Sequence, residues 1–302
     1  MSNSSMSLAL EEGRRIGFAE FGDPTGVPCF FVHGYGSSRW MASWTMSNEL
    51  LERHSVRMIA VDRPNYGLST PQYPRAGFVH WAADASALAE HLGLRRVSVV
   101  GVSMGAGPAL ALSARRPDLV SSTTILSGMP PVNARERWTP ASRADALYWK
   151  LARGAPWILR RLCALSSSML ARAAEGDADA LIARMERALS ESDRQVFRSL
   201  LDNETSRAAF VSDVRESSRQ GGAATAGDLR QYLSPWEFAP EEVSGPVMLW
   251  HGIDDPKVPV ELARRLAVRL PNCEAHYIPG GHFSPLTHRD EILRRLSRES
   301  GR

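Results

Sequence analysis

A serine flanked by two glycines lies where strand-like sequence changes into helix-like sequence. The run "VSVVGVSMGAGPAL" begins at Val97 with β-branched residues, which favour a buried strand, and continues after Met104 with residues that favour a helix. A strand that turns directly into a helix forces Ser103 into an unfavourable backbone conformation and crowds the positions two residues away. Gly101 and Gly105 remove this crowding, so the pattern predicts a nucleophile elbow that exposes the serine hydroxyl.

A serine hydroxyl is a weak nucleophile, so it requires a base, an orienting acid and an oxyanion hole. Two downstream loops supply candidates in the order Ser, Asp or Glu, His that the elbow motif requires. The first loop carries Asp254 and Asp255, and the second carries Gly280, Gly281 and His282. Each loop follows an expected strand, at the sheet edge where α/β proteins bind ligands. His282 is therefore the candidate base, and either Asp255 or Asp254 is the candidate acid.

Five motifs together resemble the α/β-hydrolase fold superfamily and occur in the order typical of it. They are "HGYG" at 33–36, "DRPNYGLS" at 62–69, "GVSMG" at 101–105, "DDPKVP" at 254–259 and "GGH" at 280–282. The resemblance implies a triad of Ser103, Asp255 and His282, with Asp254 as the rival acid. It also implies an oxyanion hole formed by two backbone amides, which belong to Tyr35 and Met104.

The resemblance extends from about residue 8 to 128 and from about residue 236 to the end, and the middle of the chain is divergent. Asn65 stands where glycine is common in the family, and asparagine also tolerates the left-handed conformation. We expect His33 to make hydrogen bonds that shape its loop, and Asp62 and Arg63 to organise the next one.

Alternating strand-like and helix-like segments predict a mainly parallel, doubly wound α/β sheet with helices on both faces. A hairpin is expected at the N-terminus, around residues 12–13. Further strands are expected at 27–32, 56–61, 97–100, 120–126, 247–250 and 275–278, and helices at 40–54, 78–92 and 104–115. Ser38 is a candidate cap for the first of these helices.

Residues 131–235 lack β-branched runs and have helical spacing, which predicts a helical cap (lid) between the sixth and seventh strands. The α/β-hydrolase core would then consist of residues 1–130 and 236–302. Within the cap, the stretch at 217–232 is expected to form a return loop. A cap of this kind closes over the site and selects the substrate.

Three tryptophans of the cap are candidates for lining a hydrophobic substrate pocket: Trp138, Trp149 and Trp157. Buried aromatic residues also pack against one another in protein cores, so each could instead belong to the core of the cap. The partner expected from this pocket is a hydrophobic small molecule.

The composition is typical of a protein without nucleic-acid or membrane partners. The net charge of +3 is small and the arginines are dispersed. No apolar run is long enough to span a membrane, and the start of the chain lacks the features of a signal peptide. Cys29, Cys163 and Cys273 are widely spaced, which favours reduced thiols in a cytoplasmic protein. We expect no metal and no cofactor, and the sequence does not predict the oligomeric state.

These residues together predict a serine hydrolase that cleaves a carboxylic ester, lactone or thioester by acyl transfer to water, an EC 3.1.1-like activity. Two alternatives remain open. The same triad could serve carbon–carbon bond hydrolysis, perhydrolysis or a biosynthetic tailoring step, or the fold could belong to a non-catalytic binding protein. Ser103 argues against an epoxide hydrolase or dehalogenase, which would have aspartate at the elbow.

Overall fold

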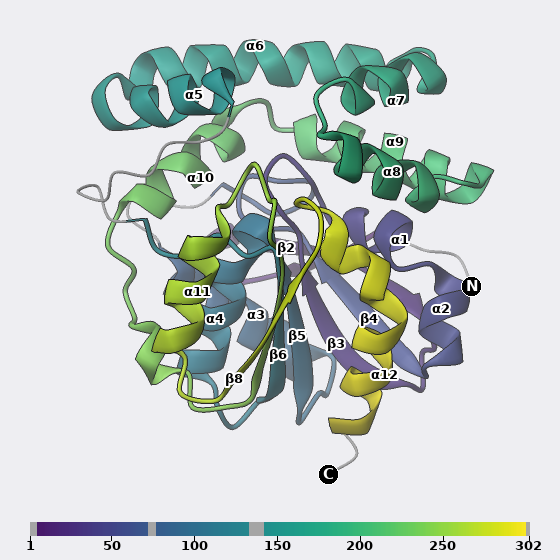
Figure 1. Ribbon diagram of the computed structural model, residues 1–302. Helices are drawn as coiled ribbons and strands as arrows, with labels where there is room; N and C mark the ends of the chain where they lie inside the picture. The colour runs from purple at the N-terminus through teal and green to yellow at the C-terminus, as the bar shows by residue number, and fades with distance from the viewer. Residues whose placement is uncertain (1–4, 72–76, 133–141, 300–302) are drawn as a thin grey trace.

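The computed structural model of the protein describes residues 5–71, 77–132 and 142–299 (Figure 1). Its centre is an eight-stranded sheet with the order β1-β2-β4-β3-β5-β6-β7-β8, in which the pairs β1/β2 and β2/β4 are antiparallel and the others parallel. The strands are β1 Met6–Ala9, β2 Arg15–Gly22, β3 Val27–Val32, β4 Val56–Val61, β5 Val97–Val102, β6 Val120–Leu126, β7 Val247–Gly252 and β8 Cys273–Ile278. The predicted hairpin and the predicted doubly wound α/β sheet are confirmed.

Both faces of the sheet are covered, and alternate residues of a central strand point to opposite faces. In β3, Phe30 and Val32 belong to one apolar cluster, whereas Cys29 and Phe31 belong to the other. Helices α3 Phe78–His91, α4 Ala106–Arg115 and α11 Val260–Arg269 contribute to the first cluster, and α1 Met41–Thr45, α2 Asn48–Arg53 and α12 Arg289–Glu299 contribute to the second. Strands buried on both faces are apolar along their whole length, which explains the unbroken hydrophobic runs of the sequence.

The single helix expected at residues 40–54 is wrong, because the structure has two short helices there. The first, α1, ends before Met46, whose backbone leaves the helical region with φ −127° and ψ 86°. Ser47 then starts α2, and its hydroxyl accepts a 3.3 Å hydrogen bond from the amide of Leu50. A serine that can cap a new helix thus competes with continuation of the old one. Ser38 does not cap α1, because the N-cap residue is Trp40.

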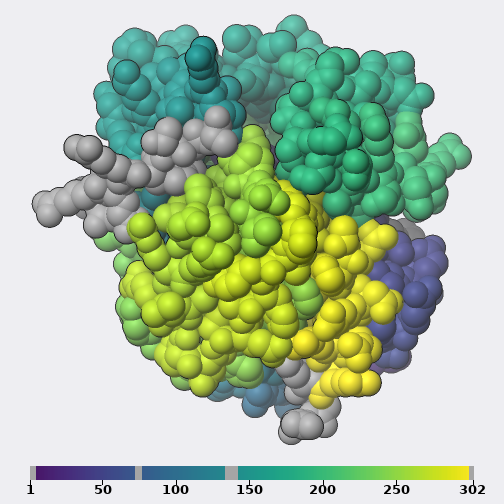
Figure 2. Space-filling view, viewed as in Figure 1, coloured from purple at the N-terminus to yellow at the C-terminus, as the bar shows by residue number. Residues whose placement is uncertain are grey.

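Six helices form a layer across the carboxyl end of the sheet, shown in teal and green at the top of Figures 1 and 2. They are α5 Arg143–Gly154, α6 Pro156–Glu175, α7 Ala178–Glu186, α8 Glu191–Leu200, α9 Glu204–Ser218 and α10 Ala223–Leu233. The layer lies between β6 and β7 in the chain, where the helical cap was predicted. Its division from the core as a separate domain stays a prediction.

The return loop predicted at residues 217–232 is wrong, because α9 continues to Ser218 and α10 begins at Ala223. A tight turn joins the two helices, with Gly221 at a φ of +75°. Gly222 lies against the backbone of Cys163 in α6, where a side chain would collide. Close packing against α6 therefore stabilises a helix that the glycine-rich sequence does not favour by itself.

None of the described helices is both long enough and apolar enough to cross a lipid bilayer. Within residues 5–71, 77–132 and 142–299, no group of three or more His, Cys, Asp or Glu side chains is arranged to hold a metal ion.

Candidate active site

Ser103 comes directly after β5 and is the first residue of a short 3-10 helix that leads into α4. Its φ angle is 52°, in the left-handed region that serine rarely adopts. A Cβ atom at Gly101 would lie 2.8 Å from the Cβ of Ala109. A Cβ atom at Gly105 would collide with the carbonyl oxygen of Val32. The predicted strained turn is confirmed, and both glycines are required by close packing.

Backbone groups of this turn are held from two directions. The amide of Met129 donates a 3.0 Å hydrogen bond to the carbonyl oxygen of Ser103. On the other side, the hydroxyl of Tyr232 from α10 donates a 2.7 Å hydrogen bond to the carbonyl oxygen of Met104. The Ser103 hydroxyl makes no hydrogen bond within the described part of the chain, and its side chain is only partly buried. It is therefore accessible to a reacting molecule.

Asp255, after β7, and His282, after β8, form a hydrogen-bonded pair. The distance from His282 Nδ1 to Asp255 Oδ2 is 2.7 Å, and the carboxylate is fully buried. The other carboxylate oxygen accepts hydrogen bonds from the amides of Lys257, at 2.8 Å, and Val258, at 3.0 Å. These contacts fix the carboxylate, and they leave Nε2 as the ring nitrogen of His282 that can act on a substrate.

Asp254, the rival acid, is exposed and makes different contacts from those of Asp255. Its amide donates a 3.0 Å hydrogen bond to the carbonyl oxygen of Gly280, and its carboxylate accepts one from the amide of Gly280 at 3.3 Å. Asp254 therefore ties the two loops together, whereas Asp255 contacts the imidazole. The geometry favours Asp255 over Asp254 as the partner of His282.

The two members of the pair shift each other's pKa. Burial alone would raise the pKa of Asp255, but the charge of His282 and the hydrogen bonds to the carboxylate outweigh burial and lower it. Burial alone would lower the pKa of His282, but the charge and hydrogen bond of Asp255, with a further contribution from Asp193, raise it. The site thus favours an ionised carboxylate and stabilises a protonated imidazole.

Residues 127–129, after β6, connect Ser103 to His282. The Ser127 hydroxyl donates a 2.7 Å hydrogen bond to the carbonyl oxygen of His282, while Met129 donates to that of Ser103. Ser127 itself has a φ of 47°, and its amide donates to Trp250 in β7 at 2.9 Å. The turn therefore holds the serine and the histidine at the same edge of the sheet. No motif in the sequence pointed to Ser127.

The loop after β3 lies against the serine. A Cβ atom at Gly34 would be only 3.3 Å from the Cβ of Ser103. His33 accepts a 3.0 Å hydrogen bond from the amide of Arg63, and its Nδ1 lies 2.9 Å from the carbonyl oxygen of Gly34. Burial and the charge of Arg63 keep the pKa of His33 well below its usual value. The predicted structural role of His33 is confirmed.

Tyr35 and Met104 carry the two backbone amides that were predicted to form an oxyanion hole. The amide of Tyr35 donates no hydrogen bond to another described residue. Met104 lies in the first turn of a helix, where amide groups have no partner within the helix. The role of these amides as oxyanion donors stays a prediction.

The three tryptophans predicted for the pocket have different surroundings. Trp138 lies outside the described residues. Trp149 is buried in α5 within an apolar cluster that includes Leu159. Trp157 is 70% exposed on α6, which does not support its assignment to a substrate pocket. The proline at the N-terminus of α6 starts a helix whose first turn points Trp157 outward.

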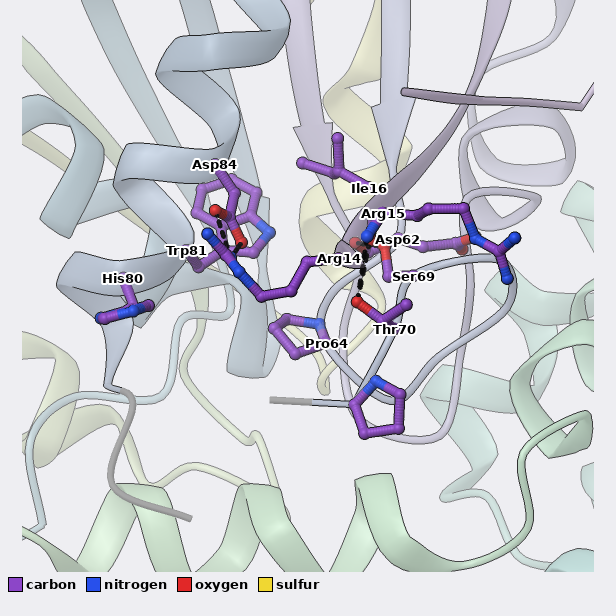
Figure 3. Close-up of a pocket in the computed structure, with 11 residues that line it drawn as sticks. Arg14, Arg15, Ile16, Asp62, Pro64, Ser69, Thr70, His80, Trp81 and Asp84 are labelled. Carbon is purple, nitrogen blue, oxygen red and sulfur yellow. Dashed lines mark hydrogen bonds and ion pairs between the residues drawn. The ribbon is translucent and has the colours of Figure 1, made fainter. Parts of the chain in front are cut away.

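A concave site shown in Figure 3 is separate from Ser103 and His282. It lies between the start of β2, the loop after β4 and the first turns of α3, and His80 and Ser69 are among its lining residues. Arg14 in this site is already paired with Asp84 at 2.6 Å. We assign no function to this site.

Helices of the layer contribute side chains that sequence reasoning missed. Asp213 of α9 accepts hydrogen bonds from the Ser37 hydroxyl, from the amide and hydroxyl of Ser38, all at 2.7 Å, and from the Trp44 indole at 3.0 Å. Burial raises the pKa of Asp213 to about 6. An aspartate within an amphipathic helix looks like a solvent-facing residue in the sequence, so no signal there could have identified it.

Asp228 of α10 makes a second contact of this kind. Its carboxylate accepts two hydrogen bonds from the Arg63 guanidinium and one from the Tyr66 hydroxyl, each at 2.7 Å. Arg63 in turn donates a 2.8 Å hydrogen bond to the carbonyl oxygen of Gly34. The helical layer is therefore bonded, through Arg63, to the loop beside Ser103.

A mostly parallel sheet with a strained serine at its carboxyl edge defines a protein of the doubly wound α/β class. Comparison with known families gives the same result more specifically. A family model described as alpha/beta hydrolase fold matches residues 28–289. The chain belongs to the α/β-hydrolase fold family, as its five motifs predicted.

Curated relatives resemble part of the chain. The non-heme chloroperoxidase of Streptomyces lividans is 30% identical over 135 residues, which cover 44% of this chain and 48% of that protein. The bifunctional esterase/perhydrolase of Acinetobacter calcoaceticus is 28% identical over 134 residues, which cover 44% and 48%. The chain thus spans about half the length of the curated relatives it matches.

Solved structures resemble the whole chain. An alpha/beta hydrolase fold protein from Nakamurella multipartita has a TM-score of 0.70 and 21% identity, and the match covers 99% of this chain and 100% of that one. At this identity the match supports the fold.

Proposed function

We propose that the protein is a serine hydrolase that cleaves a carboxylic ester, lactone or thioester of a hydrophobic small molecule. The observation that carries the proposal is the 2.7 Å hydrogen bond between His282 and the buried Asp255, at the same sheet edge as the strained Ser103. A serine hydroxyl, an imidazole and an orienting carboxylate are the three groups that acyl transfer requires. Their order along the chain is also that of the elbow motif.

In this mechanism the Ser103 hydroxyl attacks the substrate carbonyl, and Nε2 of His282 accepts its proton. Asp255 holds Nδ1 and stabilises the imidazolium that forms. The imidazolium then protonates the leaving group, and an acyl-serine remains. Water, activated by the same imidazole, hydrolyses the acyl-serine and regenerates the hydroxyl.

The amides of Tyr35 and Met104 would stabilise the oxyanion of the tetrahedral intermediate. Each such donor contributes about 3 kcal/mol at the transition state. Support comes from the position of the β3 loop against Ser103 and from the hydrogen bond of Met129 to the carbonyl oxygen of Ser103, which belongs to the same peptide as the Met104 amide.

A hydrophobic substrate is proposed because the helices of the layer bury apolar side chains, Trp149 among them. Trp149 remains a candidate contact of the apolar group, whereas the exposed Trp157 is not part of the proposed pocket. Relatives named as an esterase/perhydrolase and as a hydrolase also agree with acyl chemistry.

The test is hydrolysis of p-nitrophenyl esters of graded chain length, together with labelling by a fluorophosphonate probe. Wild-type protein is expected to be labelled and active, and Ser103→Ala is expected to lose labelling and about 10⁴-fold in kcat/KM. Ser98→Ala, a buried serine of β5 away from the turn, is the matched control and is expected to be labelled. Full activity of Ser103→Ala would falsify the proposal, and a wild-type protein that resists the probe would indicate a binding protein.

Perhydrolysis is the second candidate, because the relatives include haloperoxidases and a protein named as a perhydrolase. In this reaction hydrogen peroxide replaces water, attacks the acyl-serine and leaves as a peracid. Bromination of monochlorodimedone in acetate, bromide and hydrogen peroxide measures peracid release, because the peracid oxidises bromide to the brominating species. The rate should vanish in Ser103→Ala if the same acyl-serine serves both reactions.

A further inference from the structure

A buried carboxylate from α8 is bonded to the residue that follows His282. Asp193 Oδ1 accepts a 2.7 Å hydrogen bond from the amide of Phe283, and the aspartate is only 2% exposed. Its other oxygen accepts a 2.8 Å hydrogen bond from the hydroxyl of Ser190. Ser190 also caps α8 by accepting from the amide of Asp193. Each carboxylate oxygen thus has its own donor, one from α8 and one from the histidine loop.

The second glycine of the histidine loop permits this approach. A Cβ atom at Gly281 would lie 2.5 Å from both carboxylate oxygens of Asp193, which leaves no room for a side chain. A second contact between α8 and the loop lies close by, because the rings of Phe197 and Phe283 stack with centroids 6.2 Å apart. The loop is therefore shaped to receive the carboxylate of α8.

We infer that Asp193 is a positioning residue for His282. It fixes the backbone on which the histidine is carried, and it supplies a negative charge near the imidazole in addition to that of Asp255. This inference rests on the proposed function, in which His282 is the base. It makes the helical layer a component of the catalytic machinery, in addition to its role in covering the site.

Several charged or titratable groups act on the imidazole of His282. Asp255 and Asp193 favour its protonated form, and Lys257 opposes it. His251 also lies close, within 3.5 Å of Asp255, and burial lowers its pKa. Removal of the Asp193 charge should therefore lower the pKa of His282, because one of the two carboxylates that stabilise the imidazolium is lost.

Asp193→Asn separates the charge from the hydrogen bond, since the amide oxygen can still accept from Phe283. In this variant the acidic limb of the kcat/KM profile should move to lower pH. At pH 5.5 the fraction of plateau activity that remains should be about threefold larger in the variant than in the wild type. Asp193→Ala removes the hydrogen bond as well, and it should lower kcat by about tenfold in addition.

The pKa of His282 can also be measured without turnover, by NMR titration of the imidazole in the Ser103→Ala background. Glu191→Gln is the matched control, because this acid of the same α8 is exposed, and its carboxylate bonds to Arg194 at 2.6 Å and Gln195 at 3.4 Å. It should leave both the titration and the pH profile unchanged. Ser190→Ala removes the cap and keeps the carboxylate. It should therefore lower Tm, whereas the acidic limb of the kcat/KM profile should stay close to that of the wild type.

An unshifted His282 titration in folded Asp193→Asn overturns the electrostatic part of the inference. Wild-type kcat in folded Asp193→Ala overturns the positioning part. If Asp193→Ala does not fold, Asp193→Asn decides the electrostatic part, and wild-type kcat in folded Gly281→Ala, whose Cβ would lie 2.5 Å from the carboxylate oxygens of Asp193, overturns the positioning part. Activity that survives in Ser103→Ala would instead contradict the proposed function, and the NMR titration would still report on Asp193.

Discussion

Tyr232 in α10 donates a 2.7 Å hydrogen bond to the carbonyl oxygen of Met104, the residue that follows Ser103. The same hydroxyl accepts a 3.0 Å hydrogen bond from the amide of Gly107 in the first turn of α4. One phenol from the helical layer therefore satisfies two backbone groups of the serine turn. The peptide whose amide is proposed to bind the oxyanion is adjacent to this contact.

Tyr232→Phe tests this contact, because it removes the hydroxyl and keeps the ring. Two buried backbone groups lose their partner, so the free energy of unfolding should fall by about 1–3 kcal/mol. Because the peptide next to the proposed oxyanion amide is no longer held, kcat should also fall. Urea denaturation and ester hydrolysis measure the two effects. Tyr277→Phe, in β8 beside Arg264, should change neither, and equal effects of the two variants would contradict a specific role for Tyr232.

Asp255→Asn should lower kcat/KM by about 10⁴-fold, because the amide cannot stabilise the imidazolium of His282. Asp254→Asn is the natural control, since Asp254 bonds to Gly280 and is exposed. It should keep activity within a few-fold of the wild type. The opposite ranking of the two variants would show that the wrong aspartate has been assigned.

Activity should rise with pH as His282 loses its proton, because only the neutral imidazole can accept the proton of Ser103. The charge and hydrogen bond of Asp255 raise the pKa of His282 against the effect of burial, so the midpoint should lie above that of an unperturbed histidine. A kcat/KM profile between pH 5 and 9 measures it. A midpoint below the pKa of an unperturbed histidine would contradict the prediction that the effect of Asp255 outweighs that of burial.

Asp213 should make stability depend on pH, because its pKa in the folded protein is about 6, above its ordinary value near 4. Its contribution is fully present below the unfolded pKa and is lost as pH rises through about 6. The wild type should therefore lose stability relative to Asp213→Asn between pH 4.5 and 7.5, as measured by urea unfolding. Glu175→Gln, at the exposed end of α6, should leave the pH dependence unchanged, and parallel curves for wild type and Asp213→Asn would refute the prediction.

Gly281→Ala should lower both activity and stability, because its Cβ would lie 2.5 Å from the carboxylate oxygens of Asp193. Gly227→Ala in α10 is the matched control, since a Cβ atom there meets nothing within 4 Å. It should raise the free energy of unfolding by about 0.5–1 kcal/mol, because alanine is the better helix former. Thermal unfolding and ester hydrolysis distinguish the two glycines.

The central strands and the serine turn could be predicted from the sequence because their causes are local. Each buried strand is an unbroken apolar run, and the turn needs glycine at positions 101 and 105 whatever else surrounds it. The loops that carry Asp255 and His282 could likewise be placed, since parallel strands end at one edge. The choice between Asp254 and Asp255 could not, because adjacent residues on a loop point in directions that only packing decides.

The structure of the helical layer could be predicted only in part from local sequence. Its helices could be predicted from spacing, but the turn between α9 and α10 depends on close contact of Gly222 with α6. Trp157 is exposed although a tryptophan side chain favours burial, and Asp193 is buried although a carboxylate favours water.

The sequence by itself determined the sheet, the strained Ser103 turn and the chain order of serine, acid and histidine, because each follows from neighbours a few residues apart. Only the tertiary structure decided that Asp255 rather than Asp254 meets His282, and that Asp193, Asp213, Asp228 and Tyr232 bond to the loops of the site. Those contacts join residues more than 20 positions apart, and a buried hydrogen bond between distant segments leaves no periodic pattern in the chain.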